Sequence, residues 1–155
     1  MTYETIFMKL VADLRGSMCE KEDLEVPSGT SALSYSLRAD DVSFVLFYDT
    51  AEPRPDFLLL CEMGRLPTHD RDELLRGLLE TNLINALHGG PVIGLQYSGE
   101  IVHCIHRIPL SFPLDAVMAA IDAGVREARR WRRDRARTPS PSRRSCCPAG
   151  TRSTG

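Results

Sequence analysis

Hydrophobic and polar positions near the start of the chain recur at the spacing of a helix. Apolar residues fall three and four positions apart between residues 2 and 15, and Gly16 offers a natural end. The pattern predicts one amphipathic helix of about three turns, and the polar residues 19–29 that follow predict a loop. The apolar stripe consists of Ile6, Phe7, Leu10, Val11 and Leu14.

Three segments after residue 30 have the pattern of strands. Residues 31–39 alternate apolar and polar side chains, residues 42–48 (VSFVLFY) carry large apolar groups on both faces, and residues 57–61 are apolar throughout. Asp40-Asp41 fits a tight hairpin link, so an antiparallel meander is predicted. A strand that is apolar on both faces lies in the middle of a layer or under a ligand.

A leucine-rich helix is predicted after the third strand. Thr68 can cap its start, and Gly89-Gly90-Pro91 ends it. Its apolar face is wider than the roughly 100° stripe that packing against a single core requires. The surplus goes either to thicker packing within the monomer or to a second copy of the chain.

The remaining pattern completes an α+β fold. Residues 92–97 and 100–108 predict a hairpin, and residues 114–133 predict a last helix, which gives antiparallel strands and three helices in the order α-β-β-β-α-β-β-α. Residues 1–134 therefore form one domain. Residues 135–155 are rich in Pro, Ser, Arg and Cys and hold no bulky apolar residue, so a disordered tail is expected because burial cannot offset the entropy of ordering.

Charge divides the chain into an acidic body and a basic end. Residues 1–125 hold nine basic and nineteen acidic side chains, whereas residues 126–155 hold ten arginines and two acids. An acidic body favours a polypeptide partner over nucleic acid. The arginines of residues 126–137 could bind RNA, DNA or an anionic membrane. We favour a solvated helix end whose cations complement the helix dipole, because no nucleic-acid motif surrounds them.

Cysteine usage and the amino-terminal sequence indicate the compartment. The five cysteines are odd in number and scattered, which favours a reducing environment. The first residues lack a long apolar run, so neither a secretory signal nor a membrane anchor is predicted. We therefore expect a cytoplasmic protein that does not bind membranes.

Residues capable of catalysis or metal binding do not form a recognisable pattern. His103 and His106 are an odd number of positions apart on a strand and project to opposite faces, so they cannot share a metal ion without a bulge. Cys61 and Cys104 lie among apolar neighbours, where a thiol is unreactive. No phosphate-binding loop is present. The sequence therefore predicts no metal, no cofactor and no enzymatic activity.

Four strings of residues resemble one known family. LLLCEMGRLP, LLRGLLETNL, GLQYSGEIV and HRIPL follow one another in the order and spacing found in type III secretion chaperones of class I, the Tir-chaperone family. The resemblance covers about residues 3–131. It implies a twisted antiparallel sheet with three helices, a homodimer without enzymatic activity, and a cytoplasmic chaperone that keeps the amino-terminal segment of a secreted effector extended and soluble.

The resemblance also implies two sets of contact residues. The dimer contact would involve Leu83, Ile84, Leu87, Val92, Ile93 and Leu95. The effector segment would enter grooves lined by Phe7, Leu10, Leu14, Phe44, Leu46 and Tyr48, and part of it would add a strand to the sheet edge.

Release of the effector would need an external remodeller such as the export ATPase. Two alternatives to the chaperone hypothesis stay open. One is an adaptor or anti-activator that sequesters a regulatory protein through the same groove, and the other is a small enzyme.

Overall fold

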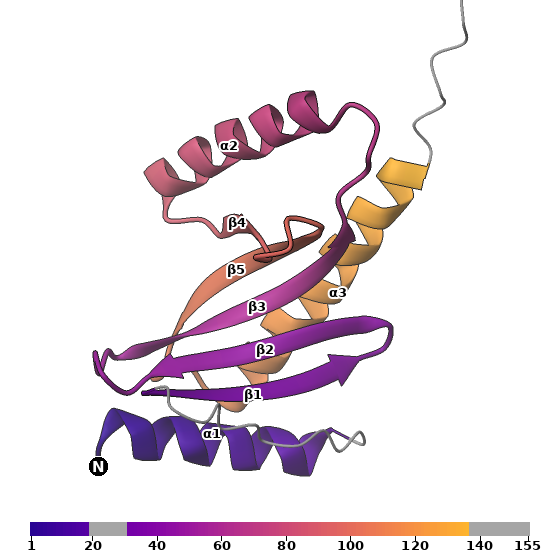
Figure 1. Ribbon diagram of the computed structural model, residues 1–155. Coiled ribbons are helices and arrows are strands. Elements are labelled where there is room, and N and C mark those ends of the chain that lie inside the picture. The colour runs from indigo at the N-terminus through magenta and orange to yellow at the C-terminus, as the bar shows by residue number, and fades with distance from the viewer. Residues whose placement is uncertain (19–30, 137–155) are drawn as a thin grey trace, which may run out of the picture.

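The computed structural model describes residues 1–18 and 31–136 (Figure 1). The order of elements is the predicted one. The predicted loop at 19–29 and the predicted tail from residue 137 onward lie outside the described residues, and residues 135 and 136 continue the last helix. The elements are α1 (Tyr3–Ser17), β1 (Ala32–Ala39), β2 (Val42–Asp49), β3 (Asp56–Arg65), α2 (Arg71–His88), β4 (Val92–Leu95), β5 (Ile101–Pro109) and α3 (Leu114–Ala136).

The five strands form one sheet in the order β1-β2-β3-β5-β4, and every neighbouring pair is antiparallel. The predicted meander and the predicted second hairpin are both confirmed. Asp40 adopts a left-handed conformation (φ 56°) in the tight turn between β1 and β2. β3 runs four residues past its predicted end because a bulge between Glu62 and Gly64 shifts the register and lets the pairing with β5 continue.

The start of α2 differs from the sequence-based prediction. Thr68 was expected to cap this helix, but the helix begins at Arg71 and its N-cap is Asp70, whose side chain makes no capping hydrogen bond. Thr68 lies two residues before this N-cap, outside the capping position. The Arg71 guanidinium instead donates to the Gly99 carbonyl (2.8 Å) in the β4–β5 turn, which ties the start of α2 to that hairpin.

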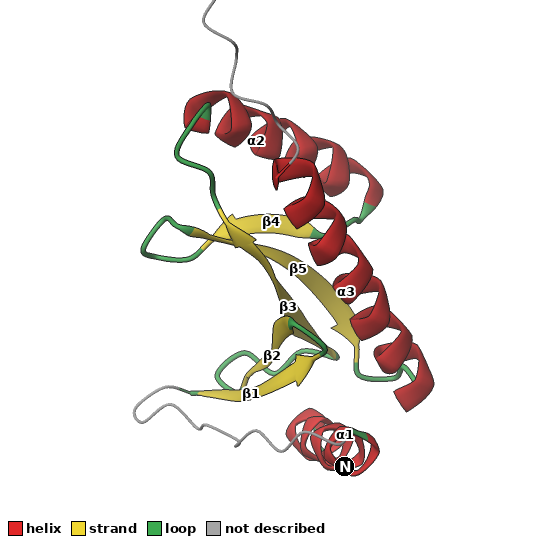
Figure 2. Ribbon diagram, turned by 90° about the vertical axis from the view of Figure 1, so that its right-hand side faces the viewer, coloured by secondary structure: helices red, strands yellow, loops and turns green. Residues whose placement is uncertain are grey.

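The core lies between one face of the sheet and two of the helices. Figure 2 shows α1 and α3 on the same side of the sheet. Inward-facing side chains of all the strands except β4 are buried there with the apolar stripe of α1. Phe7 of α1 stacks on Tyr48 of β2 (centroids 5.4 Å apart) and packs against Phe57 of β3 (5.7 Å), which joins α1 to the middle of the sheet.

Close packing of α3 depends on Gly124. A Cβ atom at this position would lie 2.7 Å from Cε1 of the buried Phe44 ring and 3.3 Å from the Cys61 sulfur. The first distance is shorter than a carbon atom tolerates in a close-packed core, and the second is tighter than most contacts of a Cβ atom. Absence of a side chain at position 124 therefore lets α3 approach β2 and β3, and this helix makes its most extensive contact with β3.

Replacing Gly124 by Ala should destabilise the fold by about 1–3 kcal/mol, because the added methyl group overpacks the core against Phe44. Gly77, in the exposed part of α2 with no atom within 4 Å of its Cβ position, provides the matched control. Gly77→Ala should be neutral or stabilise by up to about 1 kcal/mol through helix propensity. Urea unfolding of both variants measures the difference, and equal stability of the two would contradict this account of α3 packing.

Candidate protein-binding surfaces

Helix α2 leaves most of its apolar side chains in solvent. Leu78 is its buried residue, whereas Leu79, Leu83 and Leu87 are 69%, 66% and 75% exposed. These three leucines are four residues apart and form one stripe, with Ile84 (58% exposed) beside it. A helix that is apolar on several sides normally lies between two covering layers. Here its contact with the rest of the subunit is mainly through β4.

The apolar surface continues from α2 onto the uncovered face of the sheet. Register partners Val45, Leu60, Ile105 and Val92 lie side by side on neighbouring strands from β2 to β4. They point away from α1 and α3, because the alternate residues of the same strands fill the core. We call these four residues the open-face row. Three are partly exposed and Val92 is 51% exposed.

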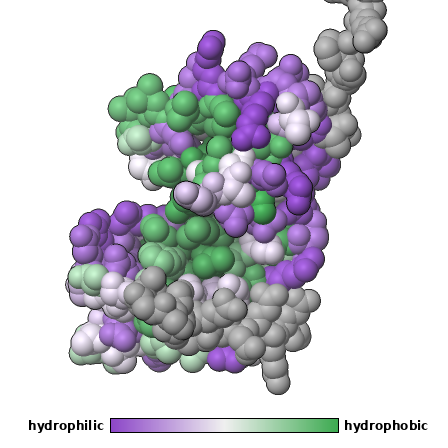
Figure 3. Space-filling model, viewed as in Figure 1, coloured by the Kyte–Doolittle hydropathy of each residue, from purple (hydrophilic) through white to green (hydrophobic). Residues whose placement is uncertain are grey.

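A second apolar pair widens this face. Phe47 of β2 lies opposite Leu58 of β3, directly beside the open-face row. Figure 3 shows this side of the molecule, with hydrophobic side chains gathered in the hollow between α2 and the lower strands. Scattered exposed apolar residues are ordinary, but a contiguous patch of this kind is typical of a protein-binding surface.

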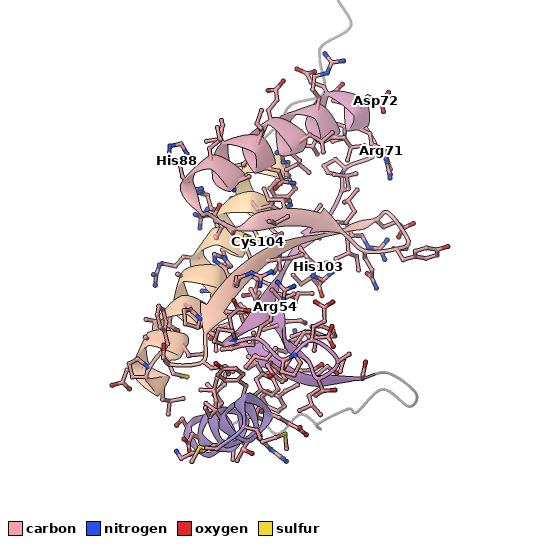
Figure 4. The ribbon with its side chains drawn as sticks, turned by 90° about the vertical axis from the view of Figure 1, so that its left-hand side faces the viewer. Arg54, Arg71, Asp72, His88, His103 and Cys104 are labelled. Carbon is pink, nitrogen blue, oxygen red and sulfur yellow. The ribbon has the colours of Figure 1, made fainter. Side chains whose placement is uncertain are left out.

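His103 also lies on the uncovered face. It faces Glu62 across the β3–β5 pairing, while its neighbour Cys104 projects to the opposite side of β5 (Figure 4). The Nδ1 atom of His103 is buried and has no hydrogen-bond partner within residues 1–18 and 31–136. Buried polar atoms in folded proteins nearly always have a partner.

The six residues expected to line the effector groove are all buried in the core. Their exposed fractions do not exceed 9%, and they lie on the inner side of α1 or on the covered face of β2. The segment VSFVLFY carries large apolar groups on both faces, as predicted, but its large apolar side chains that are left partly exposed are Val45 and Phe47. In this subunit the following residues offer a partner little or no surface: Phe7, Leu10, Leu14, Phe44, Leu46 and Tyr48.

One of these residues nevertheless borders the surface. Tyr48 lines a cavity of about 370 Å³ together with the first residues of the chain, Thr50 and Pro53. Tyr3, which is 44% exposed, lies at the same cavity and belongs to the first turn of α1. The cavity is mainly apolar and is open, so it can accept one bulky side chain of a partner.

The six residues expected at the dimer contact are accessible in this subunit. Ile93 is partly exposed, and the other five are at least 40% exposed. The structure brings together the α2 and β4 members of the set: Leu83, Ile84, Leu87, Val92, Ile93 and Leu95. The sequence-based set did not include Leu60 and Ile105, because a sequence does not show which strands become neighbours across the sheet.

Asn82 closes the outer edge of β4. Its side-chain amide donates to the Ile93 carbonyl (2.8 Å) and its oxygen accepts from the Ile93 N–H (2.7 Å). These two bonds are the ones that a neighbouring strand would make. Asn85 similarly donates to the Pro91 carbonyl (2.7 Å). Strand addition at this edge is therefore blocked at Pro91 and Ile93, and β1 forms the other edge of the described sheet.

Among the described residues, the cysteines and histidines do not form a reactive site. Burial raises the pKa of Cys61 to about 12 and that of Cys104 to about 11, so both thiols stay protonated and poorly nucleophilic near neutral pH. Burial also lowers the pKa of His106, whose Nε2 lies 3.4 Å from the Cys104 sulfur. Within the described residues no group of three or more His, Cys, Asp or Glu side chains is arranged to hold a metal ion.

The arginines of α3 are largely engaged within the subunit. Arg129 forms ion pairs with Asp40 and Asp41, and its hydrogen bond holds the pKa of the Asp41 carboxyl below its usual value. Arg132 donates to the Asp41 carboxylate (2.9 Å) and to the Met63 carbonyl at the β3 bulge (3.0 Å). These contacts fasten α3 to the β1–β2 turn. They favour the structural interpretation of the cluster over a nucleic-acid site.

The described helices include none that is long and apolar enough to cross a lipid bilayer. α3 is the longest, and its carboxyl-terminal half is rich in arginine.

The sequence and the fold were compared with those of known proteins. The model of the Tir chaperone protein (CesT) family matches residues 30–132. No curated protein matches the sequence. A chain of the HopA1–SchA chaperone–effector complex is 22% identical with a TM-score of 0.58, covering 83% of this chain and 94% of that one. A chain of the ExsC–ExsE complex is 17% identical with a TM-score of 0.67, covering 86% and 96%.

The family match spans well over half of the chain. It includes all five strands of the described residues, the whole of α2 and most of α3. The protein belongs to the Tir chaperone (CesT) family. The two solved structures show the same fold, so the predicted arrangement of three helices and a five-stranded antiparallel sheet is confirmed.

Removing the Asn82 amide should loosen the β4 edge. In Asn82→Ala the Ile93 N–H loses its acceptor, and we expect amide hydrogen exchange at Ile93 to accelerate at least tenfold, equivalent to about 1.4 kcal/mol of local stability. Asn82→Asp keeps the acceptor and loses the donor, so it should show a smaller acceleration. Exchange followed by NMR measures both variants, and unchanged protection of Ile93 in Asn82→Ala would show that Asn82 does not close this edge.

Proposed function

We propose that this protein is a cytoplasmic chaperone for a type III secreted effector, and that it holds the effector's amino-terminal segment extended and soluble until export. The observation that carries the proposal is the large apolar surface formed by the α2 stripe and the open-face row in a member of the Tir chaperone family. The HopA1–SchA structure, which shares the fold, is a chaperone–effector complex.

A homodimer would cover the α2 stripe. Leu83, Leu87 and Val92 are each more than half exposed, and Val92 lies beside Ile105 in the open-face row. A second copy laid against α2 and β4 would therefore reach the open face of the sheet without a gap in the apolar surface. Burial of each leucine contributes about 1.5–3 kcal/mol, which is sufficient for several such residues to hold two subunits together.

The effector segment would bind at the opposite end of the sheet. Because Asn82 closes the β4 edge, an extended segment would pair with the β1 edge. One of its apolar side chains would enter the cavity at Tyr3 and Tyr48, next to α1. This assignment keeps only Tyr48 from the sequence-based set, adds Tyr3 of α1, and leaves the other five residues as core.

The proposed action is physical and requires no catalysis. The buried thiols have raised pKa values, and masking a guest's apolar segment prevents its aggregation without making or breaking a bond. Release would depend on an external remodeller such as the export ATPase. Sequestration of a regulatory protein would use the same surfaces, and the ExsC–ExsE complex shows that a chain of this fold occurs in a second protein complex.

Co-expression with candidate partners tests the function. The chaperone should co-purify with the amino-terminal segment of a secreted effector, in a complex of two subunits and one guest, and should raise the soluble yield of that segment. Mass spectrometry of proteins captured in the native bacterium identifies the guest. Capture of a regulatory protein with no secreted effector would favour the adaptor alternative, and a monomer that binds no effector segment would overturn the proposal.

A charge placed on the α2 stripe should separate the subunits. In Leu83→Glu and Leu87→Glu an unpaired carboxylate would have to be buried at the dimer contact. The dissociation constant of the dimer should therefore increase at least tenfold. Light scattering should show twice 17.3 kDa for the wild type and a shift toward 17.3 kDa for these variants. Thr81→Glu, which changes the opposite side of the same helix, is the control. A wild type that is monomeric at all concentrations would contradict the dimer.

A further inference from the structure

A groove on the covered side of the sheet separates α2 from α3. Its deeper part is a cavity of about 410 Å³ whose floor includes Cys61, Val102 and Cys104. A second, larger cavity of about 570 Å³ continues it toward the start of α2 and the end of α3. The two cavities share the following lining residues: Thr81, Ile93, Glu127 and Trp131.

The groove stays accessible in the proposed homodimer. Thr81 lines the groove, whereas Leu83 belongs to the exposed leucine stripe. A separation of two residues places these side chains about 200° apart around the helix axis. The leucine stripe therefore points away from α3, and a second copy bound to it leaves the groove to another occupant.

The walls of the groove include apolar side chains that are only partly covered. Leu74 of α2, Ile93 of β4 and Trp131 of α3 are partly exposed there. The outward N–H and carbonyl groups of Ile93 are already bonded to Asn82. An occupant of the groove therefore binds through side-chain contacts and not by extending the sheet at Ile93.

Two acidic side chains without an ion pair line the outer end of the groove. Asp70 and Glu73 border the larger cavity, and neither is paired with a described basic residue. A third acid of this cavity, Glu127, is paired with Arg130 (2.8 Å). The outer end of the groove therefore complements an occupant with basic side chains.

The last described residues of the chain belong to this groove. Arg135 lines the larger cavity, and α3 ends one residue later at Ala136. The Arg135 guanidinium lies over the Trp131 ring (4.3 Å), and its buried Nε has no hydrogen-bond acceptor among the described residues. The carboxyl-terminal tail, residues 137–155, therefore starts at the wall of the groove.

The composition of the tail matches the groove. Proline-rich segments bind aromatic surfaces at a low cost in conformational entropy, and Pro139 and Pro141 follow closely on Trp131 in the chain. The tail contains no acidic residue. Its four basic residues are Arg137, Arg143, Arg144 and Arg152. The tail can therefore supply both the cations and the proline rings that the groove favours.

The length of the tail permits this docking. Trp131 lies five residues before the end of α3, about 7.5 Å along the helix. An extended chain advances about 3.3 Å per residue, so residues 137–141 can return to the Trp131 ring. Because the tail and the groove belong to one chain, an effective concentration of about 1 mM populates even a weak contact.

We propose that residues 137–144 dock in the α2–α3 groove of their own subunit. The two prolines of this segment lie against Trp131, and its two adjacent arginines face Asp70 and Glu73. The docked tail covers the apolar walls of the groove in a subunit that holds no guest. The docking is independent of the proposed function, because the dimer surface and the proposed guest site at β1 stay free.

Fluorescence of Trp131, the single tryptophan of the chain, tests the docking in the full-length protein. A docked tail shields the indole ring from acrylamide. Asp70→Asn with Glu73→Gln removes the acidic pair, so release of the tail should raise the quenching constant about twofold. Asp72→Asn with Glu80→Gln removes the same charge from exposed positions of α2 outside both cavities and should leave the constant unchanged.

Charge exchange between tail and groove provides a second readout. Arg143→Glu with Arg144→Glu should raise the constant as much as loss of the acidic pair, whereas Arg152→Glu should not. Adding Glu73→Arg to the double variant should return the constant toward the wild-type value. Circular dichroism should show an unchanged fold for all of these variants. Equal quenching in the wild type and in both released variants would overturn the docking.

A photoreactive amino acid at Thr81 identifies the occupant. It should cross-link residues 137–144 of the same chain, which a mixture of isotope-labelled and unlabelled protein distinguishes from a link between two chains. A cross-link to a second copy or to the guest, with none to the tail, would overturn the docking. Neither result changes the test of the chaperone function by co-expression.

Discussion

The rest of this structure depends on one constraint: helices of the subunit cover only one of the two faces of the sheet. α1 and α3 cover one face (Figure 2), on which the core aromatic residues and Gly124 allow close packing. On the other face, no helix of the described residues covers the open-face row and Phe47. α2 does not supply the missing layer. It lies beside β4, fastened by Asn82 and Asn85, with its leucine stripe in solvent.

The magnitude of this exposure matters for stability. Domains of this size are stable by about 5–15 kcal/mol, and full burial of one leucine is worth about 1.5–3 kcal/mol. Leu79, Leu83 and Leu87 in water therefore represent a large share of the stability available to the chain. A second subunit and a guest segment would recover that contribution, which explains how binding can be strong although no reactive group takes part.

The order of elements could be predicted from sequence because local patterns determine it. The strand alternation, the tight Asp40-Asp41 turn and the helix stop at Gly89 each depend on a few neighbouring residues. The surface residues could not be selected in the same way. In VSFVLFY both sets of alternate positions contain large apolar residues, and only the packing of α1 and α3 decides that Phe44 faces the core and Phe47 the open side.

Features that join distant segments were also beyond the sequence. The sequence-based analysis noted Asn82 only as part of a family string, although its amide completes the β4 edge eleven residues away. Likewise, Arg132 contacts the Met63 carbonyl at the β3 bulge, and the local sequence pattern does not predict this bulge. The leucine-rich helix, in contrast, could be interpreted from sequence. Its apolar face is wider than packing against one core requires, and the surplus corresponds to the exposed leucine stripe of α2.

Hydrogen exchange of the wild-type protein by mass spectrometry tests the central claim most directly. In an isolated subunit α2 has one buried side chain and little tertiary contact, so its amides should exchange far faster than those of α3. If a second copy covers α2, its protection should approach that of α3 at high protein concentration and fall on dilution. Rapid exchange of α2 at every concentration, with α3 protected, would contradict the account.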